Sequence, residues 1–202
     1  VCSGQVLHCP YDFDKAKLVV KEMTDLMTLD LVDKRLVTDQ IVLTVGYDIE
    51  NLTDPDRYRK YKGSVTIDRY GRKVPKHAHG TTNLKKTSST MLITDAVMEL
   101  YDRIVDKNLL IRRINITANK LVDESFSKEE ETYEQLDLFT DYTVKEQEQA
   151  EEEAVLEREK RMQQTMLTIK KKFGKNAILK GMNLQEGATA KDRNEQIGGH
   201  KA

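Results

Sequence analysis

Contact with phosphate groups is the chemistry that this sequence offers most clearly, and it is concentrated in residues 57–87. Basic residues crowd this stretch, and Asp68 is its only acid. Lysine and arginine neutralise phosphates, and the small hydroxyl side chains between them can add short hydrogen bonds. The pattern indicates a nucleic-acid-binding surface; the alternative is a solvated edge strand protected by its charges. The basic residues are Arg57, Arg59, Lys60, Lys62, Arg69, Arg72, Lys73, Lys76, Lys85 and Lys86.

The sequence offers no comparable pattern for catalysis or metal binding. His77 and His79 would place two imidazoles on one side of an extended segment, but their spacing matches no closed zinc site. We expect them to contact phosphate or solvent. The sequence contains no phosphate-binding loop, dinucleotide fingerprint or nucleophile elbow. It therefore predicts no active site, no metal and no cofactor in this chain.

Composition places the chain among cytoplasmic proteins with one full domain and an appendage. The 202 residues carry a net charge of -1, yet the basic stretch lies in the first half and residues 125–159 are rich in glutamate. Cys2 and Cys9 form no disulfide framework, and no signal peptide or membrane-spanning run is recognisable. Because the sequence begins with Val1 inside an apparent strand, we expect it to be the C-terminal piece of a longer protein.

Hydrophobic periodicity predicts a strand, a helix and a second strand in residues 1–48. Residues 5–9 favour a strand that stops at Pro10. Asp12 or Asp14 can cap the helix that follows, where apolar residues recur at helical spacing. Residues 39–48 then alternate with a period of two and are rich in β-branched side chains, which is typical of a strand.

The next part predicts a strand, a helix and a final strand after a loop over residues 51–62. The third strand starts after Gly63, and a basic loop or an irregular strand with a turn at Gly80 follows it. Ser88 or Ser89 caps the second helix, and residues 110–121 alternate again as the fourth strand.

This βαββαβ order predicts an α+β fold with a four-stranded antiparallel or mixed sheet and two helices on one face. The other face stays open. It lacks the aromatic pair of an RNA-stacking sheet, which argues against that class. Its expected outward residues on the last two strands are Ser64, Thr66, Arg113, Asn115 and Thr117.

Composition changes abruptly after Leu121, which divides the chain into residues 1–122, an acidic linker over 123–143, and a helix with a polar tail over 144–202. The linker contains the peptide Gln135, Leu136, Asp137, Leu138 and Phe139. Its large apolar side chains have no local core, so we interpret the peptide as one that docks into a pocket on a partner protein. The alternative is local packing against the neighbouring domain or helix.

Residues 144–173 contain no glycine or proline and favour a long helix. Met162, Met166, Ile169 and Phe173 recur at helical spacing, which predicts a docked or paired helix and allows homo-oligomerisation through residues 155–173. The alternative is a solvated single helix. Residues 183–202 are polar and contain glycine, so we expect a loosely held tail.

Taken together, these segments resemble the C-terminal part of a bacterial Y-family lesion-bypass DNA polymerase of the UmuC-like (ImpB/MucB/SamB) branch. Residues 3–7, 79–82, 87–89 and 111–114 resemble segments of its little finger domain, which contacts DNA. Residues 135–139 resemble the bacterial sliding-clamp-binding pentapeptide, and residues 169–184 resemble tails of the same branch.

The resemblance implies that this region binds the backbone of primer-template DNA, recruits the sliding clamp and works with the palm, fingers and thumb of a parent polymerase. It also implies a location at the bacterial nucleoid. Mg²⁺ is expected only in the palm, whose carboxylates would lie upstream of Val1. The other hypothesis is a stand-alone, non-catalytic adaptor that tethers a partner protein to DNA. The expected DNA contacts are Arg69, Arg72, Lys73, Lys76, Gly80, Thr81, Thr82, Lys85, Ser88, Arg112, Arg113 and Asn115.

Overall fold

The main sheet of the computed structural model contains four antiparallel strands in one continuous order. The structure describes residues 1–68, 70–126, 142–197 and 200–201. The strand order is β1-β6-β2-β5, and a short strand, β7, pairs with β2 off this path. The predicted α+β fold is confirmed, and the sheet is antiparallel along its whole path. The strands are β1 (Cys2–Tyr11), β6 (Ile111–Asn119), β2 (Leu36–Tyr47), β5 (Ala78–Thr87) and β7 (Val122–Asp123).

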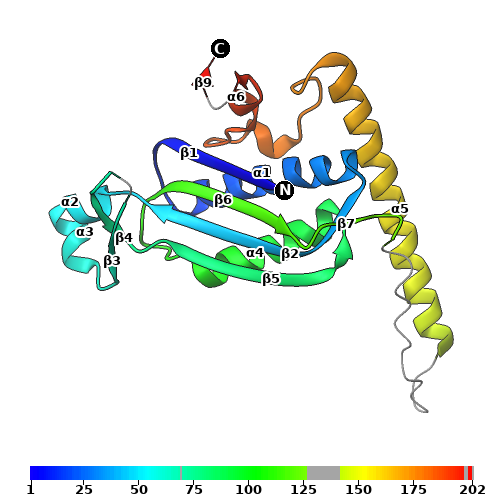
Figure 1. Cartoon of the computed structure of the whole chain (residues 1–202), viewed down its shortest axis with the longest axis horizontal. Helices are drawn as coiled ribbons and strands as arrows, with labels where there is room; N and C mark the ends of the chain where they lie inside the picture. Colours follow the sequence, from blue (N-terminus) through cyan, green and yellow to red (C-terminus); the bar gives the residue numbers. More distant parts are fainter. Residues whose placement is uncertain (69, 127–141, 198–199, 202) are drawn as a thin grey trace.

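Two helices, α1 (Phe13–Asp33) and α4 (Thr90–Ile104), cover one face of this sheet (Figure 1). Asp12 begins α1 by accepting a hydrogen bond from the backbone N–H of Lys15 at 2.8 Å. Ser89 begins α4 in the same way, through the N–H of Leu92. Both caps satisfy amides that have no partner within the first turn of a helix.

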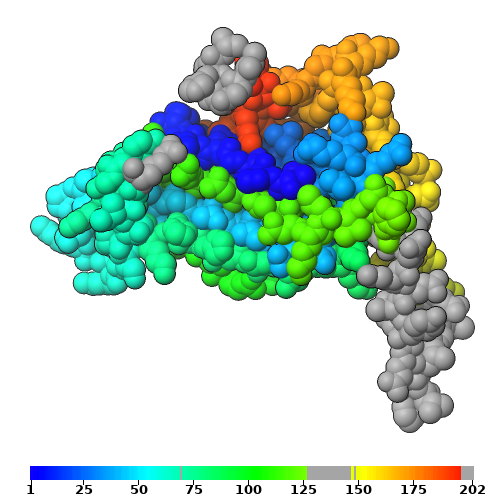
Figure 2. All heavy atoms as spheres, viewed as in Figure 1, coloured from blue at the N-terminus to red at the C-terminus, as the bar shows by residue number. Residues whose placement is uncertain are grey.

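The core lies between the sheet and these helices because apolar residues occupy every second position of the central strands. On β2 these residues are Ile41, Leu43 and Val45, and on β6 they include Ile114 and Ile116, all fully buried. The intervening residues point to the other face, which carries no helix in Figures 1 and 2. The fold therefore leaves one broad side of the sheet for a binding partner.

A strand follows Gly63 as predicted, but its predicted place in the main sheet was wrong. In the described residues, strand β3 (Val65–Ile67) pairs with β4 (Lys73–Pro75) in a separate hairpin, and β5 takes the place beside β2 in the main sheet. Ser64 and Thr66 therefore do not lie on the open sheet face. The error has a physical cause: only one face of β5 meets the core, and it does so through small residues and Leu84, which give a weak alternating pattern.

Residues 50–76 form a compact insertion at the end of the sheet where β2 finishes and β5 starts, and we call it the hairpin module (Figure 1). The predicted loop contains two short helices, α2 (Glu50–Thr53) and α3 (Pro55–Lys60), ahead of the hairpin. The side chain of Asp54 caps α3 through the amides of Asp56 and Arg57. Proline at the first helical position then fixes the start of α3.

The long helix α5 (Tyr142–Phe173) packs against α1 with the second half of its length, so the predicted docking is confirmed there. Gln163 and Met166 are buried in this contact at 2% and 8% exposure, whereas Met162 and Phe173 remain exposed. Part of the predicted apolar stripe is thus used within the chain. Homo-oligomerisation through residues 155–173 stays a prediction.

The expectation of a loosely held tail is wrong for residues 183–197. A 3-10 helix, η1 (Gly181–Leu184), and a short helix, α6 (Ala190–Asn194), pack back on α1. Buried Glu22 of α1 accepts hydrogen bonds from the Asn183 side chain at 2.8 Å and from the amides of Thr189 at 2.7 Å and Ala190 at 3.1 Å. Polar anchoring of this kind leaves no hydrophobic pattern in the sequence. Two short strands, β8 (Gln196–Ile197) and β9 (His200–Lys201), end the described chain.

Candidate nucleic-acid interface

The open face of the sheet carries rows of short polar side chains that run across neighbouring strands, together with Val42 and exposed Val6. Asn115 of β6 lies between Gly4 of β1 and Thr44 of β2, and Thr44 pairs in turn with His79 of β5. The next row contains Thr117, Val42 and Thr81. The row beyond it contains Asn119, Gln40 and Asn83 in register. Because these residues alternate with the buried ones, they all point away from the helices.

Hydrogen bonds along these rows hold the polar side chains in place. Thr44 Oγ1 lies 2.9 Å from Nδ1 of His79, and Gln40 Nε2 donates to Asn83 Oδ1 at 3.0 Å. Asn119 Nδ2 donates to Gln40 Oε1 at 3.4 Å. Side chains positioned in advance lose less conformational freedom when they bind a ligand.

Two glycines allow the rows to pack closely. A Cβ atom on Gly4 would stand 2.5 Å from Oδ1 of Asn115, and one on Gly46 would stand 3.2 Å from Cβ of Arg113. Larger residues at Gly4 or Gly46 would displace Asn115 or Arg113. The two glycines therefore leave room on the face for the side chains of Asn115 and Arg113.

The cations of the face are Arg113 on β6 and Lys85 on β5, both exposed. Arg112 differs from Arg113 although the two are adjacent in sequence. The β2–β6 register shifts between Gly46 and Tyr47, and Arg112 lies at this irregularity with its Nε 3.7 Å from a carboxylate oxygen of Asp48. Arg113 is therefore the better placed of the two for a ligand on the sheet.

The structure separates the predicted DNA-contact residues into groups. Thr81, Lys85, Arg113 and Asn115 lie on the open face. Arg72, Lys73 and Lys76 lie in the hairpin module, and Arg69 lies outside the described residues. The clamp-like residues 135–139 also lie outside them.

Three predicted contacts are turned away from the open face. Gly80 is not in a turn but inside β5, where an added Cβ would stand 2.9 Å from both Leu100 and Ile104 of α4. Thr82 lies two residues further along β5 and shares this helix-facing side. Ser88 lies at the start of α4, where its carbonyl accepts a hydrogen bond from Gln163 of α5 at 3.0 Å. These three residues therefore hold β5, α4 and α5 together.

Sequence reasoning missed the contribution of β2 to this face. Gln40 and Thr44 alternate with buried Ile41, Leu43 and Val45, so the period-two pattern that predicted the strand could also have identified its outward positions. Asn83 and Asn119 complete the rows from β5 and β6. His79 was expected to contact phosphate or solvent. Its pairing with Thr44 depends on the register between β2 and β5, which the pattern of a single strand does not reveal.

Other chemistry finds little support in the part of the chain that the structure describes. No group of three or more histidine, cysteine, aspartate or glutamate side chains there could hold a metal ion. Burial raises the pKa of Tyr101 far above its usual value, so this phenol stays neutral and donates a hydrogen bond to the Phe13 carbonyl at 2.9 Å. No helix of the described residues combines the length and hydrophobicity needed to cross a membrane.

Comparison with known families identifies the class of protein to which the chain belongs. Residues 7–138 match the impB/mucB/samB family C-terminal domain, which is more than half of the chain. The chain therefore belongs to this family and represents the C-terminal region of a UmuC-like Y-family DNA polymerase. A comparison with curated proteins found no match.

Proposed function

We propose that this chain holds primer-template DNA against the open face of its sheet and recruits the sliding clamp through residues 135–139. The observation that carries the DNA proposal is the set of hydrogen-bonded polar rows beside Arg113 and Lys85, on a face that no described helix covers. The clamp proposal rests on the sequence of residues 135–139 and on the family.

The composition of the face favours contacts with the DNA backbone over recognition of base sequence. Asparagine, threonine and histidine side chains suit phosphate and sugar oxygens, and exposed cations suit the phosphate charge. A surface of this kind releases counterions when it binds, so its affinity falls steeply with salt concentration and depends little on sequence. Lesion bypass requires such tolerance because the enzyme must hold templates of any sequence.

The chain needs no cofactor for either of these roles. Phosphoryl transfer by the parent polymerase would use Mg²⁺ held by palm carboxylates, with the present region positioning the substrate duplex. The partners of this region would then be duplex DNA, the clamp, and the palm, fingers and thumb. In a bacterium it would act in the cytoplasm, at the nucleoid.

The decisive experiment measures the affinity of the full chain for a fluorescent primer-template duplex between about 50 and 200 mM salt. We expect a steep fall in affinity, and Arg113→Ala should reduce the slope of log affinity against log salt by about one. Arg112→Ala should reduce the slope less because Arg112 lies beside Asp48.

A matched control is Lys172→Ala, which removes one exposed cation from α5, away from the sheet face. It should leave the slope unchanged. Affinity that barely changes with salt, or Arg113→Ala binding with the wild-type slope, would refute the proposal.

A further inference from the structure

Helices α4 and α5 leave an apolar groove between them at the start of α4. The groove has a volume of about 450 Å³. Met91 is 45% exposed, Leu92 is 40% exposed and Val155 is 51% exposed. Exposed apolar side chains that lie together mark a surface for a binding partner. We call this surface the α4–α5 groove, and its lining residues are Met91, Leu92, Glu151, Glu152, Val155 and Leu156.

Carboxylates stand beside the apolar side chains of the α4–α5 groove. Glu151 and Glu152 are exposed, and they precede Val155 and Leu156 by four residues each. Residues four apart are neighbours on a helix, so all four side chains lie on one side of α5. Negative charge repels the phosphates of DNA. The groove therefore suits a protein segment that combines aliphatic side chains with a cation.

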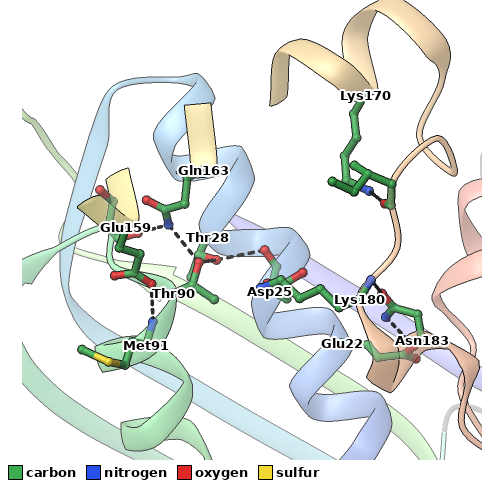
Figure 3. A network of polar contacts seen from close by, with 12 residues as sticks. Glu22, Asp25, Thr28, Thr90, Met91, Glu159, Gln163, Lys170, Lys180 and Asn183 are labelled. Atoms are coloured by element: carbon green, nitrogen blue, oxygen red, sulfur yellow. Dashed lines mark hydrogen bonds and ion pairs between the residues drawn. The ribbon is translucent and has the colours of Figure 1, made fainter. Parts of the chain in front are cut away.

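Hydrogen bonds hold the two walls of the groove together. Glu159 lies one turn beyond Val155 and accepts from the backbone N–H of Met91 (Figure 3). Gln163 donates to the carbonyl of Ser88 at 3.0 Å. Because α5 is attached to the start of α4 at these points, the groove is formed before a partner binds.

The β3–β4 hairpin has the chemistry that the groove requires. Val65 is 48% exposed and Ile67 is 68% exposed, and the alternation of a strand puts both on one face of the hairpin. Exposed Lys73 is the cross-strand partner of Ile67, so its side chain lies beside that of Ile67. The hairpin thus offers two aliphatic anchors with a neighbouring cation.

The hairpin also has a fixed shape. Asp68 accepts hydrogen bonds from the backbone amides of Tyr70 and Arg72, each at 2.9 Å, which hold the turn. At the start of β3, the hydroxyl of Tyr61 donates to the Ser64 carbonyl at 2.5 Å. A segment that is already ordered loses little conformational freedom when it binds.

Within one chain the hairpin cannot reach the groove. Strand β5 begins beside the hairpin module and ends just before α4, so the two surfaces lie at opposite ends of the sheet (Figure 1). A strand of ten residues spans about 30 Å. A hairpin that fills the α4–α5 groove must therefore come from a second copy of the chain.

We propose that this chain associates head to tail, with the β3–β4 hairpin of one copy in the α4–α5 groove of the next. Val65 and Ile67 pack between the apolar walls, and Lys73 lies beside the glutamates of the rim. Two grooves facing each other would instead bring like charges together, which disfavours a symmetric pair of α5 helices. Each copy carries both surfaces, so the interface is heterologous and does not stop at a dimer. The surfaces are small, which makes the association weak.

Sedimentation velocity of the full chain, measured without DNA, tests this inference. We expect the average sedimentation coefficient of the wild type to rise beyond that of a dimer over the micromolar range. Ile67→Glu places a carboxylate against the acidic rim, and Val155→Lys places a cation against Lys73. Each substitution should weaken association about tenfold or more, because an apolar contact is lost and a repulsion is added.

A mixture of the two variants gives the decisive measurement. Ile67→Glu keeps an intact groove and Val155→Lys keeps an intact hairpin. An equimolar mixture should therefore form a heterodimer at concentrations where each variant alone is monomeric. In a symmetric pair of α5 helices, Ile67→Glu would change nothing and mixing would restore nothing.

The controls make the same changes at exposed apolar residues outside both surfaces. Leu184→Glu alters a residue that is 73% exposed, and Met162→Lys alters one that is 56% exposed on α5. Both proteins should sediment as the wild type does. Circular dichroism verifies the fold of every variant, and Glu152→Lys at the exposed rim replaces Val155→Lys if that variant is misfolded.

The outcomes separate this inference from the proposed function. A wild type that stays monomeric, a mixture that stays monomeric, or controls that dissociate like the variants would each overturn head-to-tail association. Unchanged association of Ile67→Glu together with weaker duplex binding would assign the hairpin to DNA and also overturn it. None of these results removes the sheet interface. Absence of salt-dependent DNA binding would overturn the proposed function and leave head-to-tail association standing.

Discussion

Glu159 of α5 accepts a hydrogen bond from the backbone N–H of Met91 at 2.8 Å, so a residue of the C-terminal extension caps the first turn of α4. The hydroxyl of Ser89 donates to the same carboxylate. One turn further along α5, Gln163 donates to Thr90 Oγ1 at 2.8 Å, and Thr90 in turn contacts Thr28 of α1 (Figure 3). Helix α5 is therefore joined to both helices that cover the sheet.

Glu159→Ala should weaken the docking of α5 and lower the free energy of unfolding by about 1 kcal/mol, because two donors at the start of α4 lose their acceptor. Urea unfolding followed by circular dichroism measures the change, and limited proteolysis should detect faster cleavage within α5. Glu157→Ala is the control, since Glu157 is exposed on the same helix. Equal effects of the two substitutions would contradict the capping role of Glu159.

Gly80→Ala should destabilise the domain by about 1–3 kcal/mol, because its Cβ would press on Leu100 and Ile104 at 2.9 Å and push β5 away from α4. Thermal unfolding measures this loss. Gly181→Ala is the control: nothing lies within 4 Å of its Cβ position. A Gly80→Ala protein as stable as the wild type would show that β5 and α4 can separate at little cost.

The sequence predicted the strands and helices with strong apolar periodicity and missed elements held by other forces. Alternation of Ile41, Leu43 and Val45 identified β2 because that strand is buried on one face. Strand β5 meets α4 through small residues such as Gly80, so its pattern was compatible with either a loop or an irregular strand. The candidate site was also predicted only in part. Arg113 and Asn115 were assigned from the pattern of a single strand, whereas the contact between Thr44 and His79 depends on the register between β2 and β5.

Glu22→Gln should loosen residues 181–194 without unfolding the sheet. Glu22 is 1% exposed and its carboxylate accepts from the amides of Thr189 and Ala190, and a glutamine amide supplies one acceptor oxygen in place of two. We expect a local loss of about 1–3 kcal/mol, measured as faster amide hydrogen exchange in η1 and α6.

The control for this prediction is Glu186→Gln, which removes an ion pair between Lys15 and an 87% exposed side chain. Exposed ion pairs contribute little to stability because water and salt screen the two charges. If both variants exchange at wild-type rates, the polar anchor at Glu22 does not hold the C-terminal segment.

Acid should loosen the hairpin module at Asp54, the N-cap of α3. Hydrogen bonding from the backbone N–H of Arg57 lowers the pKa of Asp54 below its ordinary value of 3.8, and the amide of Asp56 acts in the same direction. A group whose pKa is lower in the folded state stabilises the fold above its unfolded pKa and loses this effect as the pH falls through the folded value. The amide NMR signals of Asp56 and Arg57 should therefore shift below about pH 4.

Asp54→Asn keeps a capping oxygen but removes the titration, so its amide signals at the start of α3 should not follow this transition. A wild-type response that persists unchanged in the asparagine variant would assign the titration to another group. Loss of the α3 cap would also disturb β3 and β4, because all three elements belong to the hairpin module.

Replacing Leu138 and Phe139 with alanine should abolish clamp binding and leave DNA binding intact. The two apolar residues would fill the clamp pocket, whereas the proposed DNA contacts lie on the open face of the sheet. An ion pair between Glu124 and Lys160 joins the chain before the peptide to helix α5. Surface plasmon resonance on immobilised clamp measures the loss, with Phe126→Ala as the control at an exposed aromatic residue outside the pentapeptide. Clamp affinity that survives the double substitution, or falls equally with Phe126→Ala, would assign recruitment to another surface of this chain.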